Sequence, residues 1–298
     1  VTKVSEEWFG FLCADLAGRW VVSSGNGGLY SMDKSGLGVV GHILDNPFQG
    51  YAYVTDFAPD RGDTLWTNTL NGLCWYDPVS NTQGSLKARF AGLDSLDNRF
   101  LYRDRHGLIW GRVHNNGVCA FDTRTRRLTH FPSKGKNPPF PILSATACSE
   151  GSDGDMWFGF GGEGKYLVRW RRATRVFEKV EPLCPPGSVC TKVFNILADL
   201  HGNLWLYTDQ QWFIMDTHTR QVQSFGKGNG LLTNDPEGLC FDRDGNAWIA
   251  TSYGLSRFDP RNRQLRSFFQ TDGLLSNNIT NVELIDTAHN ILFVSTDR

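Results

Sequence analysis

The stretch DRDGNAWIATSYGLSRFDP, residues 242–260, holds a polar Asp-x-x-Gly-Asn turn, a Trp-led apolar run, a second turn at Tyr253-Gly254 and a Phe258-Asp259 pair. Short runs rich in aromatic and β-branched residues, bounded by Gly and Asp, indicate β-strands joined by tight turns. The same pattern recurs as DLHGNLWLYTDQQWFIMD (199–216), DRHGLIWGRVHNNGVCAFD (104–122) and DRGDTLWTNTLNGLCWYD (60–77), and in weaker copies at 15–33, 152–170 and 286–298. The chain is therefore built from one repeated unit.

The period of this repeat is set by one aromatic or apolar position. This position falls 43 to 48 residues apart, at Trp20, Trp66, Trp110, Trp157, Trp205, Trp248 and Leu292. Each unit predicts a strand that ends near the Asp, a second strand that begins with the Trp, a third of GLxxFD type and a fourth that contains a Phe. The Phe positions are Phe90, Phe131, Phe177, Phe225 and Phe268.

Four short antiparallel strands per unit are typical of one blade of a β-propeller. The sequence thus predicts an all-β fold, a seven-bladed β-propeller with four-stranded antiparallel blades, as a single domain over residues 1–298. We expect the Trp to fill the wedge between neighbouring blades, and the Asp and Asn to bond the turn's own backbone. Helical-hairpin repeats of similar length are excluded because no 3.6-residue periodicity is present.

The last blade is expected to be incomplete in this chain. The seventh repeat predicts two strands, roughly 280–285 and 291–296, and residues 1–4 could add an outer strand to them. One strand would still be missing, which indicates a chain excised from a longer sensor protein.

The net charge and the cysteines limit which partners and cross-links the chain could have. The 298 residues carry a formal net charge of -1, which gives no indication of a nucleic-acid partner. Five of the seven Cys, namely Cys13, Cys74, Cys119, Cys148 and Cys240, lie in predicted strands, where buried small apolar side chains explain them. Cys184 and Cys190 flank the loop CPPGSVC and are compatible with either a disulfide or two nearby thiols.

The repeat resembles a known family. The order Asp-x-x-Gly-Asn-x-Trp-Ile-x-Thr, then Gly-Leu-x-x-Phe-Asp, then DGLLSNNI is similar to the two-component-regulator propeller repeat, and it is clearest over 242–259 with 272–279. The resemblance implies a periplasmic sensor domain of a bacterial hybrid histidine kinase that responds to oligosaccharides. It further implies downstream domains in the same protein, a second propeller and a homodimer. Repeat four lacks the Gly-Leu, and no kinase sequence is present.

Residues that suggest catalysis or metal binding have simpler explanations. His106, His201 and His289 occupy similar turns in three repeats, so a ring would distribute them around its rim instead of gathering them. DRDGNAW lacks the spacing and terminal Glu of a calcium-binding EF-hand loop and predicts an Asx turn. The sequence contains no nucleophile elbow, zinc-protease helix or phosphate-binding loop. We therefore predict a binding domain without catalytic residues, metal or cofactor.

The candidate ligand-binding residues lie in the loops between second and third strands and in the connections between blades. Amide, aromatic and charged groups around a concave surface suit a sugar, although Asn and Gly are also ordinary turn residues. The candidates are Asn71, His114, Asn115, Asn116, Lys165, Gln210, Gln211, Tyr253, Asn234 and Asn277.

Two other functions compete with the sensor. A propeller lyase or lactonase of the streptogramin-lyase type has similar GNxWFT blades, but it would need His and Glu to converge on a metal near the axis. A protein-interaction scaffold would instead expose large apolar residues, and Phe48, Tyr51, Phe140 and Tyr253 are compatible with that role.

Overall fold

The structure is a computed structural model of the whole chain. It describes residues 9–14, 20–24, 29–32, 39–44, 57–60, 64–69, 72–77, 79–80, 82–86, 96–113, 115–136, 139–143, 145–161, 166–181, 184–185, 190–209, 211–234, 237–286 and 291–296. Residues 1–4, which were predicted to complete the last sheet, lie outside this set.

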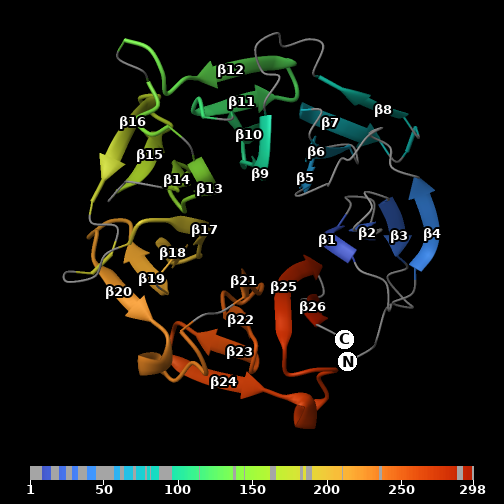
Figure 1. Cartoon of the computed structure of the whole chain (residues 1–298), viewed down its shortest axis with the longest axis vertical. Helices are drawn as coiled ribbons and strands as arrows, with labels where there is room; N and C mark the ends of the chain where they lie inside the picture. Colours follow the sequence, from blue (N-terminus) through green and yellow to red (C-terminus); the bar gives the residue numbers. More distant parts are fainter. Residues whose placement is uncertain are drawn as a thin grey trace.

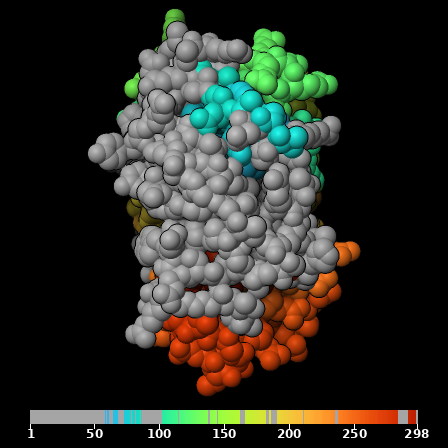
Figure 2. Space-filling view, turned by 90° about the vertical axis from the view of Figure 1, so that its right-hand side faces the viewer, coloured from blue at the N-terminus to red at the C-terminus, as the bar shows by residue number. Residues whose placement is uncertain are grey.

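The described residues form an all-β structure of consecutive antiparallel sheets arranged like blades around a centre (Figure 1). Six sheets have four strands in meander order, and one has two. The first strand of each sheet lies nearest the centre and the fourth at the rim (Figure 1). In the edge-on view the cyan atoms of 57–86 lie near the top and the orange and red C-terminal sheets at the bottom (Figure 2).

The first three sheets lie in the N-terminal part of the chain. Their strands are β1 (Phe9–Ala14), β2 (Trp20–Ser24), β3 (Leu29–Met32) and β4 (Val39–Leu44); β5 (Phe57–Pro59), β6 (Leu65–Thr69), β7 (Gly72–Asp77) and β8 (Thr82–Ser85); and β9 (Leu96–Arg103), β10 (Leu108–Val113), β11 (Val118–Asp122) and β12 (Arg127–Phe131). In the second of these sheets the fourth strand ends at Ser85, and Phe90, which was predicted to mark this strand, lies outside the described residues. Gly84 and Trp75 pair in this ladder, and β8 follows β7 after a short turn.

The remaining sheets follow the same order. Their strands are β13 (Ala145–Glu150), β14 (Met156–Phe160), β15 (Leu167–Arg171) and β16 (Val176–Val180); β17 (Val193–Ala198), β18 (Asn203–Thr208), β19 (Trp212–Asp216) and β20 (Val222–Phe225); β21 (Gly238–Phe241), β22 (Ala247–Thr251), β23 (Gly254–Asp259) and β24 (Gln264–Phe268); and β25 (Ile279–Asp286) with β26 (Ile291–Thr296). Two short 3-10 helices, η2 (Lys227–Asn229) and η3 (Gln270–Asp272), precede β21 and β25. No helix among the described residues has the length and apolar character needed to cross a membrane.

The core lies between the sheets, and the repeated Trp fills it as predicted. Trp110 on β10 is fully buried, and its ring centroid lies 5.6 Å from that of Phe158 in the next sheet. Trp205 on β18 makes the corresponding contacts with Phe241 at 5.8 Å and Phe258 at 5.9 Å. Such edge-on aromatic pairs add about 0.5–1.5 kcal/mol each beyond their buried area. At these two interfaces the Trp of the repeat therefore joins neighbouring sheets.

The repeated Asp ties the first turn to this Trp. Asp242 Oδ1 accepts the backbone N–H groups of Asp244 at 3.0 Å and Asn246 at 2.8 Å, which is the predicted Asx turn. Its Oδ2 accepts the indole N–H of Trp248 at 2.9 Å, a bond that the sequence did not predict. Asp104 and Asp199 hold Trp110 and Trp205 in the same way. One carboxylate therefore orders the turn and orients the wedge residue.

Repeat four departs from this arrangement. Gly151 stands where the other repeats have the Asp, and the buried indole N–H of Trp157 has no acceptor among the described residues. The guanidinium of Arg169 lies over the Trp157 ring at 5.0 Å instead. A Cβ at Gly151 would come within 2.9 Å of the Trp157 indole nitrogen. The Trp in this repeat is thus positioned by a cation above its ring.

Candidate functional site

The meander topology divides the loops between two faces. Because the strands of each sheet alternate in direction, turns one-to-two and three-to-four lie at one edge of the sheet, and two-to-three loops lie at the other with the inter-sheet connections. We call these edges the turn face and the connection face. Those of the ten predicted ligand-binding residues that the structure describes belong to the connection face by this topology.

The structure describes six of those ten residues, and it gives most of them local roles. Asn71, His114, Lys165 and Gln210 lie outside the described residues. Asn115 occupies the left-handed region with φ 47°, where Asn is tolerated in a tight turn. The carbonyl oxygen of Asn116 lies 2.9 Å from His130 Nε2, and Gln211 exchanges main-chain bonds with Thr208 Oγ1. Tyr253 is 60% exposed and free to contact a ligand.

Asn234 and Asn277 are equivalent residues that order the connections. The side-chain oxygen of Asn234 accepts the N–H of Lys227 at 2.8 Å, and that of Asn277 accepts the N–H of Gln270 at 2.7 Å. Each therefore holds the start of a 3-10 helix. The Gly after each helix adopts positive φ, 92° at Gly230, where other residues are strained. The recurrent GLLxN motif forms this connection, and both Asn side chains have a structural role in it.

An exposed aromatic patch near the centre of the connection face was not predicted. Phe194, the second residue of the innermost strand β17, is 43% exposed, and its ring lies 5.3 Å from that of Tyr207 on β18. The Lys192 ammonium lies 4.4 Å from the Phe194 ring centroid. Tyr207 in turn stacks on buried Trp212 at 5.2 Å, so the outer ring rests on a rigid base. We call Lys192, Phe194 and Tyr207 the aromatic patch.

A β-bulge places Phe194 in this position. The β17–β18 register shifts between Val193 and Asn195, which leaves Phe194 outside the ladder. Shifts at the same point of β1, β13 and β25 leave out Gly10, Thr146 and Thr280. Bulges often re-aim a side chain beside a binding site. Among the four strands β1, β13, β17 and β25 with this shift, β17 alone has an aromatic residue at the bulged position.

The loop beside the aromatic patch is ordered by Asp209. Its carboxylate accepts the backbone N–H of Thr191 at 3.0 Å, the Thr191 hydroxyl at 2.6 Å and the backbone N–H of Lys192 at 3.2 Å. Burial opposes ionisation of Asp209, but these hydrogen bonds outweigh it and leave the pKa below its ordinary value. Asp209 therefore remains ionised at neutral pH and fixes the backbone from which Lys192 projects.

The His and Cys residues do not gather into a site. His106 and His201 are exposed on separate turns as predicted, and His289 lies outside the described residues. Within the described ranges no group of three His, Cys, Asp or Glu side chains could hold a metal ion. Cys74, Cys119, Cys148 and Cys240 are buried, and burial raises the pKa of the Cys119 thiol to about 12.

No disulfide joins Cys184 and Cys190 in the structure, which agrees with the second of the two alternatives left open by the sequence. Burial raises the pKa of Cys190, and its hydrogen bond with Cys184 raises it further. The Cys190 thiol is therefore protonated at neutral pH.

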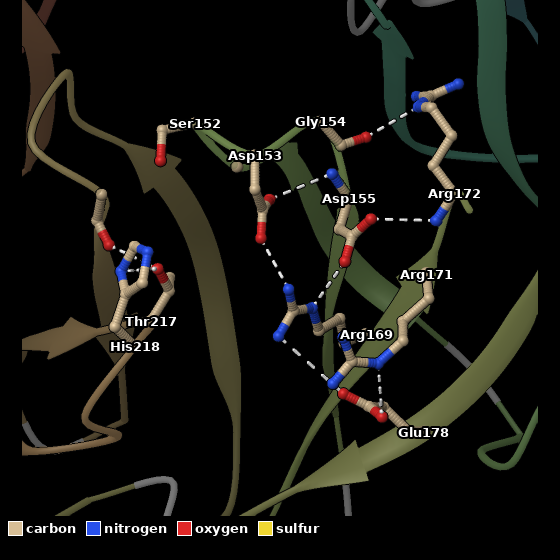
Figure 3. A network of polar contacts seen from close by, with 12 residues as sticks. Ser152, Asp153, Gly154, Asp155, Arg169, Arg171, Arg172, Glu178, Thr217 and His218 are labelled. Atoms are coloured by element: carbon tan, nitrogen blue, oxygen red, sulfur yellow. Dashed lines mark hydrogen bonds and ion pairs between the residues drawn. The ribbon is translucent and has the colours of Figure 1, made fainter. Parts of the chain in front are cut away.

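The turn face carries a charged network in the sheet β13–β16 (Figure 3). Arg169 contacts Asp153 at 2.6 Å and Asp155 at 2.8 Å, and Arg171 contacts Glu178 at 2.8 Å. These charges satisfy one another, which makes the network structural. It also holds the chain at Arg172, whose backbone N–H donates to Asp155 Oδ1 at 2.9 Å.

Several solved structures share this arrangement of antiparallel sheets around a centre. The extracellular domains of BT3049 and BT4673 from B. thetaiotaomicron, which are described as hybrid two-component systems, superpose with TM-scores of 0.71 and 0.72. The chain has the fold of these extracellular domains. Sequence identity is 15% and 18%, and 98% of this chain is covered in both cases. The predicted resemblance to two-component sensor repeats is confirmed at the level of the fold.

These neighbours are much longer than the chain, which spans 39% of the first and 37% of the second. PorZ of Porphyromonas gingivalis, a bacterial surface component of the type-IX secretion system, also has a similar fold, with a TM-score of 0.63 and 18% identity. The match covers 83% of this chain and 38% of PorZ. No protein-family model and no curated protein matches the chain.

Proposed function

We propose that residues 1–298 form one seven-bladed propeller, the extracytoplasmic, periplasmic ligand-sensing part of a hybrid two-component histidine kinase. In this proposal the chain binds an oligosaccharide and does not catalyse a reaction. The extracellular sensor domains among the structural neighbours support this role. A ligand that prefers one arrangement of the propeller against the downstream domains, within a homodimer, would shift the population of signalling states.

The aromatic patch is the observation that carries the proposal. A sugar ring presents C–H groups on its faces and hydroxyls at its edge, so an exposed aromatic ring beside polar groups is a suitable surface for it. Phe194 offers the ring, and the ammonium of Lys192 offers a donor to sugar hydroxyls. The strand β17, which carries Phe194, lies next to the centre of the ring of sheets (Figure 1).

Calorimetric titration with neutral oligosaccharides tests the proposal, using wild-type protein and a Phe194→Ala variant. Loss of one stacked aromatic ring should weaken binding about tenfold. Phe194 is already 43% exposed, so the variant should unfold at nearly the same urea concentration as the wild type.

Leu200→Ala is the matched control, because Leu200 is an exposed apolar residue, 71% exposed, on the turn face. It should bind every sugar as the wild type does. Equal sugar affinity of Phe194→Ala and wild type would contradict the assignment of the patch. If no sugar binds but a partner protein does so through Phe194, the interaction scaffold would replace the sensor.

A further inference from the structure

A groove with a volume of about 420 Å³ lies between the sheets β9–β12 and β13–β16. It opens at the turn face and follows the outer strand β12, away from the aromatic patch. Its volume is within the range of small-molecule sites. The groove is therefore a second place where a ligand could bind, independent of the proposed function.

The floor of the groove is aromatic and rigid. Trp110 and Trp170 line it, with ring centroids 4.9 Å apart, and Phe131 stacks on Trp110 at 5.9 Å. Both Trp side chains are core residues that belong to neighbouring sheets. Trp110 is fully buried and Trp170 is 5% exposed, so a ligand would meet mainly the partly exposed ring of Phe131, which is backed by two Trp rings fixed by the packing of the fold.

The walls of the groove are basic. Arg127 and Arg175 are exposed, and neither has a carboxylate partner among the described residues. The carboxylate of Asp122, the acidic residue of the lining, accepts the backbone N–H groups of Arg124 and Thr125 within its own turn. Arg127 and Arg175 therefore remain available for an anion.

Arg172 forms a fixed part of the same wall. Its Nε donates to the carbonyl of Gly154 at 2.8 Å (Figure 3). Its guanidinium also contacts Asp104 Oδ2 at 2.7 Å and lies 5.2 Å from the Trp170 ring. Because Asp104 neutralises it, Arg172 contributes shape more than charge.

Comparison with an equivalent interface explains why the groove is open. Between β17–β20 and β21–β24, Arg263 reaches across to the side-chain oxygen of Gln223 at 3.3 Å. Arg175 and Thr129 occupy the corresponding positions at the groove, since both Arg residues hold the left-handed turn position. The shorter Thr129 cannot make this bond, so space and an unpaired guanidinium remain.

Arg127, the second Arg of the groove, has no Arg counterpart in the three sheets that follow. The residue after the left-handed Arg is Arg127 at the groove, but it is Val176 in sheet β13–β16, Gln221 in sheet β17–β20 and Gln264 in sheet β21–β24. Among the described interfaces, two such Arg residues face each other only across this groove. The pair Arg127 and Arg175 is thus particular to this interface and is not required by the repeat itself.

We infer that the groove binds a carboxylated or sulfated sugar. The guanidinium groups of Arg127 and Arg175 would hold the anionic group through charge-assisted hydrogen bonds, which planar guanidinium groups make well to oxyanions. The Thr129 hydroxyl would meet a ring hydroxyl, and the aromatic floor would meet the apolar face of the ring.

Calorimetric titration with three probes tests the inference: a galacturonate tetrasaccharide, a sulfated galactan tetrasaccharide and a neutral galactan tetrasaccharide. The carboxylate and sulfate probes distinguish the two sources of negative charge. At least one anionic probe should bind, the neutral one at least tenfold more weakly, and added salt should weaken anion binding.

Three variants locate the site. Arg127→Gln and Arg175→Asn should each weaken binding of the anionic probe about tenfold, and Asn tolerates the left-handed turn position. Thr129→Gln should restore the bond seen between Arg263 and Gln223 and abolish binding while the protein stays folded.

Arg220→Asn is the matched control, because Arg220 has the same left-handed conformation in another sheet and does not line this groove. It should leave the affinity unchanged. The inference is overturned if neither anionic probe binds, if the neutral probe binds equally well, or if Arg220→Asn weakens binding as much as Arg175→Asn. Anion binding that is lost in Phe194→Ala but unaffected in Thr129→Gln would place the ligand on the connection face, overturning the groove and leaving the proposed function intact.

Discussion

Replacement of Asp104 by Asn tests how neighbouring sheets are joined. The fully buried carboxylate accepts four donors: Oδ1 accepts the backbone N–H groups of His106 and Leu108, and Oδ2 accepts the Trp110 indole at 3.0 Å and Arg172 of the next sheet at 2.7 Å. An Asn oxygen can keep the two backbone bonds. Its amide NH₂ would then face two donors, so both remaining bonds are lost.

The magnitude follows from those two bonds. A charge-assisted bond to a guanidinium contributes about 1.5–3 kcal/mol, and an unpaired buried indole N–H adds about 1 kcal/mol. Arg172 keeps the Gly154 carbonyl at 2.8 Å and Glu150 at 3.5 Å, which limits the loss. We expect Asp104→Asn to lower the free energy of unfolding by about 3 kcal/mol.

Asp199→Asn is the matched control, measured by urea denaturation followed by Trp fluorescence. Asp199 holds the same turn and Trp205, but its other side-chain partner is Asn203, whose amide can rotate to present its oxygen. This variant should cost about 1 kcal/mol. Equal losses in the two variants, or an Asp104→Asn loss that persists undiminished with Arg172→Met, would refute the role of the Arg172 bond.

Two further predictions concern a turn and the response to acid. Gly117→Ala should destabilise the protein by about 3 kcal/mol in the same urea assay, because Gly117 has φ 85° and a Cβ there would overlap the Phe131 carbonyl oxygen. Burial opposes ionisation of Asp242, but hydrogen bonds from Asn246 and Trp248 leave its pKa below the ordinary 3.8. The stability that the ionised carboxylate gives the fold is therefore present above that pH and is lost as the pH falls through the lowered pKa. Asp242→Asn should therefore lose less stability than the wild type between about pH 6 and pH 3, and parallel acid curves would contradict this.

The sequence predicted the fold well because each repeat carries its own local signals. A turn residue such as Asp242 acts within one sheet, and a wedge residue such as Trp248 lies next to the adjacent sheet. The repeated sequence pattern is therefore enough to place both. Phe90 lies outside the described residues, so its place in a fourth strand stays a prediction.

The ten candidate ligand-binding residues stay a prediction. The side-chain oxygens of Asn234 and Asn277 hold the starts of 3-10 helices, a role that the sequence does not separate from sugar binding because the same amide chemistry serves both. Phe194 was missed because a bulge, which the sequence does not mark, decides that its side chain leaves the ladder. The groove depends on Thr129, which occupies the position that Gln223 has in another sheet. The effect of this difference can be seen only when the equivalent interfaces of the structure are compared.

The meander order of the sheets has a consequence for how the chain folds. Every strand pairs with its neighbour in sequence, so each sheet can form through local hairpins with little loop-closure entropy. The contact between β1 and β25 is the exception, since it joins segments from opposite ends of the chain (Figure 1). Closure of the ring there should be the last step of folding, and amide hydrogens along that seam should exchange before those of β13 and β14.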